Sequence, residues 1–234
     1  MPLALRHAEI RIQAEHVWLD AFLGFAPDVR GLVLCAVPHL ARLKGARETR
    51  VCKVLEEAGF GTLLLSLLTP YEDTRDPDVR YDISLISQRL QAVTAWIEHQ
   101  PVMGDMPLGI VASSTIAAGA IRLASQEPER FTALVSKAGR IDLAGASPLR
   151  QVSTPSLVLI PGNEPDLRHA TSAAYSLLGG EKRLILVEGA SEDFIEPGSL
   201  ETAAQAACEW LGEHMPTASD LAPLTAEESA PFCE

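Results

Sequence analysis

Short apolar runs without polar alternation are the feature that most constrains the fold of this chain. The four clearest are GLVLCAV at 31–37, TLLLSLL at 62–68, LGIVA at 108–112 and SLVLIPG at 156–162. Continuous apolar runs bounded by turn residues are typical of strands that are covered on both faces. Two weaker runs of the same kind are FTALVSKAG at 131–139 and KRLILVEG at 182–189. The runs predict a largely parallel sheet buried between helices.

Helical patterns separate these runs. In chain order, the predicted helices run from about Ala46 to Gly59, from Asp82 to Pro101, onward from Ser114, from Pro165 to Gly179 and onward from Ser199. Asp at a helix start, Pro in a first turn and Gly after a last turn are ordinary capping signals. Strands that alternate with helices predict a doubly wound α/β sheet in a single domain spanning residues 1–215.

Both ends of the chain differ from this pattern. Near the N-terminus, EIRIQ and HVWLDAFLG predict an antiparallel pair of strands at one edge of the sheet. Residues 216–234 are acidic, contain Pro and Ser and lack periodicity, so they are predicted to form a disordered tail. The sequence leaves open whether this tail binds a partner or is a passive solvated segment.

Composition excludes several classes of function. The formal net charge of −12 would repel a phosphate backbone, and the 19 Lys and Arg residues form no basic stripe, so no nucleic-acid partner is expected. No apolar stretch approaches the ~20 residues of a membrane helix, and the first residues do not resemble a signal peptide. We therefore expect a cytoplasmic protein without membrane association. The four cysteines lie far apart and are expected to be free, mostly buried thiols.

The segment TPYEDTRDPDVRYD at 69–82 concentrates carboxylates without a metal-binding pattern. Its acidic residues are interleaved with Arg75, Pro77 and Arg80, which break the spacing of a calcium loop. We expect a solvated loop that covers the mouth of a pocket, and no metal. The chain also has neither a G-x-G-x-x-G motif nor a P-loop, so no nucleotide cofactor is expected.

The stretch PLGIVASSTIAAGA at 107–120 carries the candidate nucleophile, Ser114. An apolar strand precedes it and an alanine-rich helix follows, as in a G-x-S-x-G elbow, where small residues let the strand and helix approach closely. Ala112 nearly keeps the first small position, whereas the bulky Ile116 occupies the second. From these residues alone, Ser114 is either the nucleophile of an elbow or the N-cap of an ordinary helix.

Several segments together resemble one known family. These are LLLSLLTPYED, DISLISQRL, LGIVASSTIAAGA, SKAGRIDLAGA and VEGASEDFIEPG, in this order and spacing between about Gly31 and Met215. The chain resembles the dienelactone-hydrolase-like branch of the α/β-hydrolases. This resemblance implies a mostly parallel sheet with helices on both faces and a pocket that Ser113 and Thr115, the neighbours of Ser114, help to line.

The resemblance also implies that the catalytic machinery is degenerate. An H-G-x-G stretch shapes the oxyanion side of the family pocket, and the matching positions Val37, Pro38, His39 and Leu40 retain neither glycine. Because proline has no N–H to donate, an oxyanion hole of the usual form is not expected.

The two partners of the serine are altered as well. Glu164 matches the position of the family acid, although a carboxylate there would also suit the N-terminus of a helix. In the stretch where the family has G-A-T-H-x-F, this chain reads GASEDF, so Glu192 replaces the histidine base. A carboxylate is a far weaker partner for a serine hydroxyl than imidazole is, because its pKa is too low for proton shuttling at neutral pH.

The sequence therefore predicts an α/β-hydrolase-fold protein that keeps the pocket with little or no hydrolysis and serves as a binding, scaffold or non-hydrolytic catalytic protein. Two alternatives stay open. One is an active serine hydrolase for a small ester, lactone or thioester, with Ser114 as nucleophile and a displaced base such as His39. The other is a subunit that binds a protein partner, and a homodimer is common for such domains although no feature requires one.

Overall fold

The computed structural model describes residues 5–39 and 47–215. Eight strands form one sheet: β1 (Arg6–Ala14), β2 (Val17–Phe25), β3 (Leu32–Val37), β4 (Gly61–Ser66), β5 (Leu108–Ser113), β6 (Ala133–Lys137), β7 (Ser156–Pro161) and β8 (Lys182–Val187). All six apolar runs are strands, as the sequence predicts. The predictions for Leu40 and for the tail at 216–234 lie outside the described residues.

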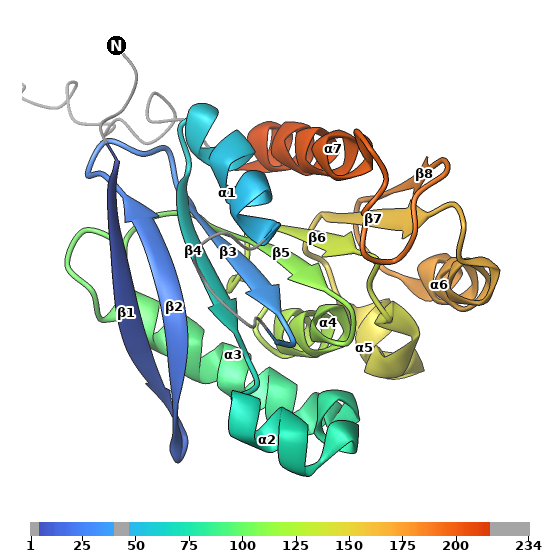
Figure 1. Ribbon diagram of the computed structural model, residues 1–234, viewed down its shortest axis with the longest axis horizontal. Helices are drawn as coiled ribbons and strands as arrows, with labels where there is room; N and C mark the ends of the chain where they lie inside the picture. Colours follow the sequence, from blue (N-terminus) through green and yellow to red (C-terminus); the bar gives the residue numbers. More distant parts are fainter. Residues whose placement is uncertain (1–4, 40–46, 216–234) are drawn as a thin grey trace, which may run out of the picture.

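The strand order across the sheet is β1-β2-β4-β3-β5-β6-β7-β8 (Figure 1). β1 and β2 pair antiparallel, with Ile12 opposite Leu19, and β2 pairs antiparallel with β4. The remaining pairs, from β4 to β8, are parallel. The predicted antiparallel pair at one edge of the sheet is thus confirmed.

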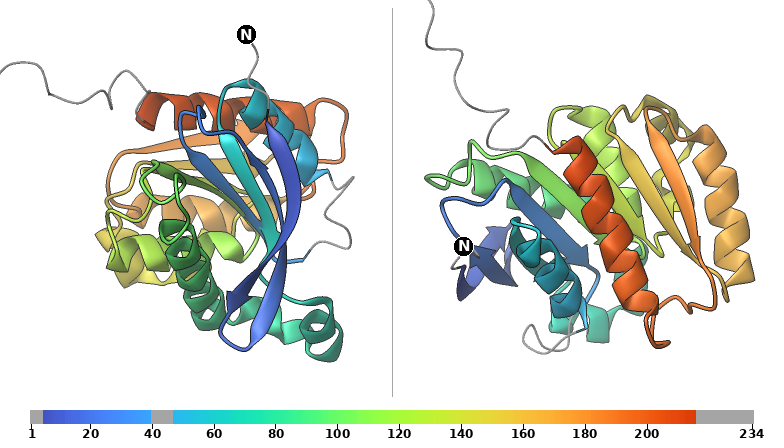
Figure 2. Two further views of the ribbon diagram at one scale, coloured as in Figure 1. Left: turned by 90° about the vertical axis from the view of Figure 1, so that its left-hand side faces the viewer. Right: turned by 90° about the horizontal axis from the view of Figure 1, so that it is seen from above.

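Helices cover both faces of the sheet. They are α1 (Glu48–Glu57), α2 (Pro70–Arg75), α3 (Ile83–Glu98), α4 (Ile116–Gln126), α5 (Ala146–Gln151), α6 (Pro165–Leu177) and α7 (Ser199–His214). α1 and α7 lie on one face, and α3, α4, α5 and α6 lie on the other (Figures 1 and 2). The five helices that the sequence predicts are all present.

Each central strand contributes to two separate hydrophobic cores. In β3, Leu34 belongs to the core under α3 and α4, whereas its neighbours Val33 and Cys35 belong to the core under α1 and α7. Successive side chains of a strand point to opposite faces. A strand buried on both faces therefore needs apolar residues at every position, which is why its sequence does not alternate.

The segment 69–82 corrects one expectation, because it is helical and not an irregular loop. It forms α2 and a 3-10 helix at Pro77–Tyr81. Thr69 and Glu72 form a capping box: the Thr69 hydroxyl accepts from the N–H of Glu72, and the Glu72 carboxylate accepts from the N–H of Thr69. The sequence contains this signal as Thr-x-x-Glu with Pro in the first turn. The short helix α5 is a further element that the sequence analysis does not anticipate.

The fold places a crevice at the carboxyl ends of β3 and β5. From β3 the chain reaches β4 through α1, on one face of the sheet, and from β4 it reaches β5 through α3, on the opposite face. Ligands of open α/β sheets bind outside the carboxyl ends of the strands, where the strand order reverses. The segments after β3 and β5 are those that carry His39 and Ser114.

Two smaller findings complete the fold. Within the described ranges, no helix combines the length and apolar character that a membrane crossing requires. Cys35 and Cys52 are free and buried, and Cys208 is free and half-buried.

Candidate functional site

Ser114 occupies a strained turn between β5 and α4. Its φ of +51° lies in the left-handed region, which costs a non-glycine residue about 1 kcal/mol or more. Its carbonyl accepts hydrogen bonds from the N–H of Arg140 at 2.9 Å and of Ala117 at 3.3 Å. The N-cap of α4 is Thr115. Ser114 is therefore not the N-cap of α4, and its backbone has the strand–turn–helix geometry of an elbow.

The bulky residue after the elbow is accommodated by the core. Ile116 is fully buried and belongs to the hydrophobic core under α3 and α4. On the other side of the turn, a side chain at Gly139 would collide with Ser136 Oγ and Ala117 Cβ. Because glycine has no side chain, the turn after β6 can approach α4 closely at Gly139. The next residue, Arg140, donates its backbone N–H to the Ser114 carbonyl.

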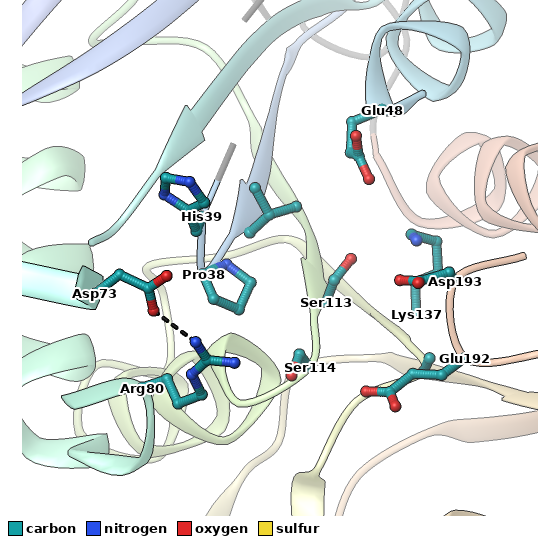
Figure 3. Close-up of a pocket in the computed structure, with 12 residues that line it drawn as sticks. Pro38, His39, Glu48, Asp73, Arg80, Ser113, Ser114, Lys137, Glu192 and Asp193 are labelled. Atoms are coloured by element: carbon teal, nitrogen blue, oxygen red, sulfur yellow. Dashed lines mark hydrogen bonds and ion pairs between the residues drawn. The ribbon is translucent and has the colours of Figure 1, made fainter. Parts of the chain in front are cut away.

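Two pockets meet at Ser114. The first, which we term the lysine pocket, has a volume of about 280 Å³ and is lined by residues that include His39, Glu48, Ser113, Lys137 and Asp193 (Figure 3). The second, the arginine pocket, has a volume of about 570 Å³, and its lining includes Tyr81, Thr115, Arg140, Glu164 and Asp166. Arg80, Ser114 and Glu192 line both pockets.

The structure brings most of the predicted site residues together here. Val37, His39 and Ser113 line the lysine pocket, Thr115 and Glu164 line the arginine pocket, and Ser114 and Glu192 line both. This arrangement unites the ends of β3, β5 and β7 with the segment after β8.

Glu164 and Glu192 are direct neighbours. The backbone N–H of Glu192 donates to Glu164 Oε1 at 3.4 Å. Glu164 is the N-cap residue of α6, but its side chain forms no capping hydrogen bond. Burial, together with the charges of Asp193 and Glu164, raises the pKa of Glu192. In Figure 3 the carboxylate of Glu192 extends toward the side of the pocket where Ser114 lies.

Histidine is scarce around Ser114. Within the part of the chain that the structure describes, His39 is the one histidine lining either pocket. It is half-buried, and its Nδ1 is buried without a hydrogen-bond partner. Elsewhere, His7 pairs with Glu56 at 3.0 Å, and His214 interacts with the Trp210 carbonyl at 2.8 Å.

The positive side chains of the arginine pocket have carboxylate partners. Arg80 forms an ion pair with Asp73 at 2.7 Å. Arg140 binds Asp142 in a bidentate manner at 2.9 and 2.8 Å, and these hydrogen bonds raise the pKa of Arg140. A bidentate pair holds a guanidinium in one orientation. Arg140 is thus a fixed part of the wall.

A buried ion pair anchors α2 next to the pocket. Arg89 of α3 is 2% exposed, donates to the Leu67 carbonyl at 2.7 Å and forms a bidentate pair with Glu72. Burial alone would raise the pKa of Glu72, but hydrogen bonds from Arg89 and Thr69 lower it to about 2. This anchor positions the next residue, Asp73, at the lysine pocket.

The sequence analysis misses Lys137, which lines the lysine pocket at the end of β6. A charged residue closing the apolar run ALVSK, at the carboxyl end of a predicted parallel strand, is the signal that could have identified it. No group of three residues that could hold a metal ion occurs among residues 5–39 and 47–215.

Curated proteins include two sequence relatives of this chain. No protein-family profile matches the chain. Two Mycobacterium tuberculosis proteins, provisionally named phosphoribosyl transferases, are 36% identical over 211 residues, which is 90% of this chain. The match covers 47% of their sequence, so the chain spans about half the length of these relatives.

Solved structures provide a closer match in length. Est1E from Butyrivibrio proteoclasticus superposes with a TM-score of 0.72 at 13% identity, over 88% of this chain and 98% of that one. A dienelactone hydrolase-like promiscuous phosphotriesterase from metagenomic libraries has a TM-score of 0.74 at 14% identity, covering 92% and 100%.

Dienelactone hydrolase from Anabaena variabilis has a TM-score of 0.84 and 32% identity, over 92% of this chain and 100% of the hydrolase. An identity of this size over the whole length of a solved relative, together with the sheet order and the elbow, shows common family membership. The chain belongs to the dienelactone hydrolase family of α/β-hydrolase-fold proteins.

Proposed function

We propose that this protein binds a small ligand in a dienelactone-hydrolase pocket that has lost efficient hydrolysis. The observation that carries the proposal is the placement of Glu192 beside Glu164, with both residues lining the pocket that contains Ser114. These are the positions at which the resemblance places a histidine and its orienting acid.

The chemistry of the substitution supports this proposal. The ordinary pKa of imidazole, about 6.5, suits proton exchange at neutral pH, whereas that of a glutamate is about 4.3. Burial raises the pKa of Glu192, but the side chain remains exposed. General acid–base catalysis contributes about 10² to 10⁴ to a rate, and this contribution is lost without a suitable base.

The charges of the lining indicate the class of ligand. In the lysine pocket, the carboxylates of Glu48, Asp73, Glu192 and Asp193 outnumber the cations of Arg80 and Lys137. In the arginine pocket, both arginines are already paired with aspartates. An anionic ligand would meet net repulsion, so a small polar ligand that is neutral or cationic fits this lining.

The test is labelling with a fluorophosphonate, which reacts with activated serines. The intact mass of the parent protein is compared with that of Ser114→Ala after exposure to the reagent. We expect no adduct on either protein. Adduct on the parent that is absent from Ser114→Ala would overturn the proposal, because it would require an activated Ser114.

A second candidate is an active serine hydrolase, which the elbow itself favours. The φ of Ser114 is strained, and the N–H groups of Thr115 and Ile116 have no acceptor within the described residues. An N–H group directly after the nucleophile is a usual oxyanion donor. His39 lines the same pocket and would be the base.

This alternative makes a separate prediction. Hydrolysis of p-nitrophenyl butyrate by the parent protein should be lost in both Ser114→Ala and His39→Ala. Turnover that survives in both variants would exclude the assignment of these two residues.

The transferase name of the Mycobacterium tuberculosis relatives does not support a transferase function for this chain. Those proteins are about twice as long as the matched region. This chain contains neither a G-x-G-x-x-G motif nor a P-loop, which are usual cradles for phosphate groups.

A further inference from the structure

Lys137 is a buried amine inside the lysine pocket. It is the last residue of β6 and pairs in register with Ser113, the last residue of β5. Its side chain lines the pocket although the residue is only 7% exposed. The ring of the buried Phe194 lies beside the amine, with its centroid 5.0 Å from Nζ. Figure 3 shows Lys137 on the same side of the pocket as Glu48 and Asp193.

The amine of Lys137 lacks the partners that a buried lysine usually has. Within the part of the chain that the structure describes, its Nζ forms no hydrogen bond and no ion pair within 4.0 Å. Lysine is almost never buried unless it is paired, because desolvation of an ammonium group is costly. Because Lys137 lines the pocket, its amine can meet a ligand that enters there.

Burial of Lys137 favours a neutral amine. Burial lowers the pKa of Lys137, while Glu48 of α1 and Asp193 of the segment after β8 oppose this effect. Arg47 lowers the pKa further, and Cys35 of β3 raises it. The net direction is downward, which increases the fraction of neutral amine at neutral pH. Only the neutral form has the electron pair that attacks an electrophile.

The other described lysines are engaged elsewhere. Lys53 has an exposed side chain 3.7 Å from Glu57. Lys182 donates to the backbone carbonyls of Tyr175, Ser176 and Leu178. Lys137 therefore differs from both in being buried, unpaired and open to a cavity.

We propose that Lys137 is a covalent binding site for a small neutral aldehyde or ketone, which it holds in the lysine pocket as an imine. The Nζ electron pair forms a bond to the carbonyl carbon, and the carbonyl oxygen takes up a proton to give a carbinolamine. Loss of this hydroxyl as water, with the second amine proton, leaves a carbon–nitrogen double bond. The step needs no oxidant or reductant.

The lining supplies the other groups that this step needs. Glu48 and Asp193 face Lys137 and are the proton acceptors and donors for formation and loss of the carbinolamine. A volume of about 280 Å³ limits the ligand to a small molecule, and the surplus of carboxylates disfavours an anionic one. The inference rests on the proposed ligand-binding function, but it uses Lys137 and not Ser114.

The sequence makes the experiment simple, because the chain has four lysines: Lys44, Lys53, Lys137 and Lys182. The full chain is incubated at pH 7 with propanal and sodium cyanoborohydride, which reduces an imine to a stable secondary amine. Peptide mass spectrometry then gives the labelling rate of each lysine. We expect Lys137 to be labelled faster than Lys53, because burial lowers the pKa of Lys137 and so increases its neutral fraction.

The imine trap and the fluorophosphonate test read different residues of the same parent protein. An adduct on Ser114 would overturn the proposed function and leave the Lys137 result standing. In Lys137→Gln the adduct at this position should be absent, and the labelling of Lys53 should stay unchanged. Labelling of Lys53 without labelling of Lys137 would overturn the inference. This outcome is measured on the parent protein, so it does not depend on whether a variant folds.

Discussion

The backbone N–H of Glu192 donates a hydrogen bond to the side-chain carboxylate of Glu164, with 3.4 Å between nitrogen and oxygen. Two segments that are 28 residues apart in the chain thus meet in the pocket that Ser114 also lines. Under the proposed function, these residues stand where the family resemblance places a base and its orienting acid.

Restoring the base should restore turnover. Glu192→His places an imidazole where the carboxylate now lies, next to Glu164, which can orient it. We expect hydrolysis of p-nitrophenyl butyrate to increase by about 10² or more over the parent. The increase should vanish in the double variant Ser114→Ala/Glu192→His. Equal rates in the parent and Glu192→His would show that Glu192 is not positioned as the base.

Glu192 should destabilise the folded protein at neutral pH. Its pKa is raised in the folded state, so the penalty is present above the raised pKa and disappears below the ordinary value of 4.5. Glu192→Gln should therefore increase the urea midpoint at pH 7 and have little effect near pH 4. The exposed Glu57→Gln serves as the matched control and should show no such pH dependence.

The strain at Ser114 should be visible in stability. Glycine tolerates a φ of +51°, whereas alanine does not, so Ser114→Gly should be more stable than Ser114→Ala by about 1 kcal/mol. In ordinary conformations the order is reversed, because glycine loses more entropy on folding. Urea denaturation of the two variants measures the difference, and greater stability of Ser114→Ala would argue against a strained elbow.

The ion pair between Glu72 and Arg89 should contribute stability that depends on pH. The pKa of Glu72 is lowered to about 2, so the contribution is present above the ordinary value of 4.5 and is lost as the pH falls toward 2. At pH 7, Glu72→Gln leaves Arg89 buried without its carboxylate. We expect a loss of about 3 kcal/mol, the lower end of the range for a broken buried pair, because Glu72 keeps some contact with solvent.

The measurement is a series of urea titrations between pH 7 and pH 2.5. The difference in unfolding free energy between the parent and Glu72→Gln should shrink as the pH falls below 4.5. Glu57→Gln, on the exposed side of α1, again serves as the control carboxylate. A difference that stays constant over this range would contradict the lowered pKa of Glu72.

Local patterns were sufficient for most of the fold. The runs that became β3, β5 and β7 are apolar at successive positions because both of their faces are buried. Asp82 caps α3 by accepting a hydrogen bond from the N–H of Leu85. These signals depend on burial and on hydrogen bonds between near neighbours. The helix α2 was also within reach, because its capping box lies within four consecutive residues.

The candidate site depended on contacts between distant segments. The sequence by itself determined the alternation of strands and helices and the position of Ser114 between a strand and a helix. It also placed Glu192 where the family resemblance implies a histidine. Only the tertiary structure decided that Ser114 takes a left-handed backbone conformation and that Glu164 contacts Glu192. The burial of Lys137 in a pocket with Glu48 and Asp193 likewise became visible only in the tertiary structure. The physical reason is that desolvation and electrostatic coupling depend on distances across the sheet, and those distances are set by packing and not by separation along the chain.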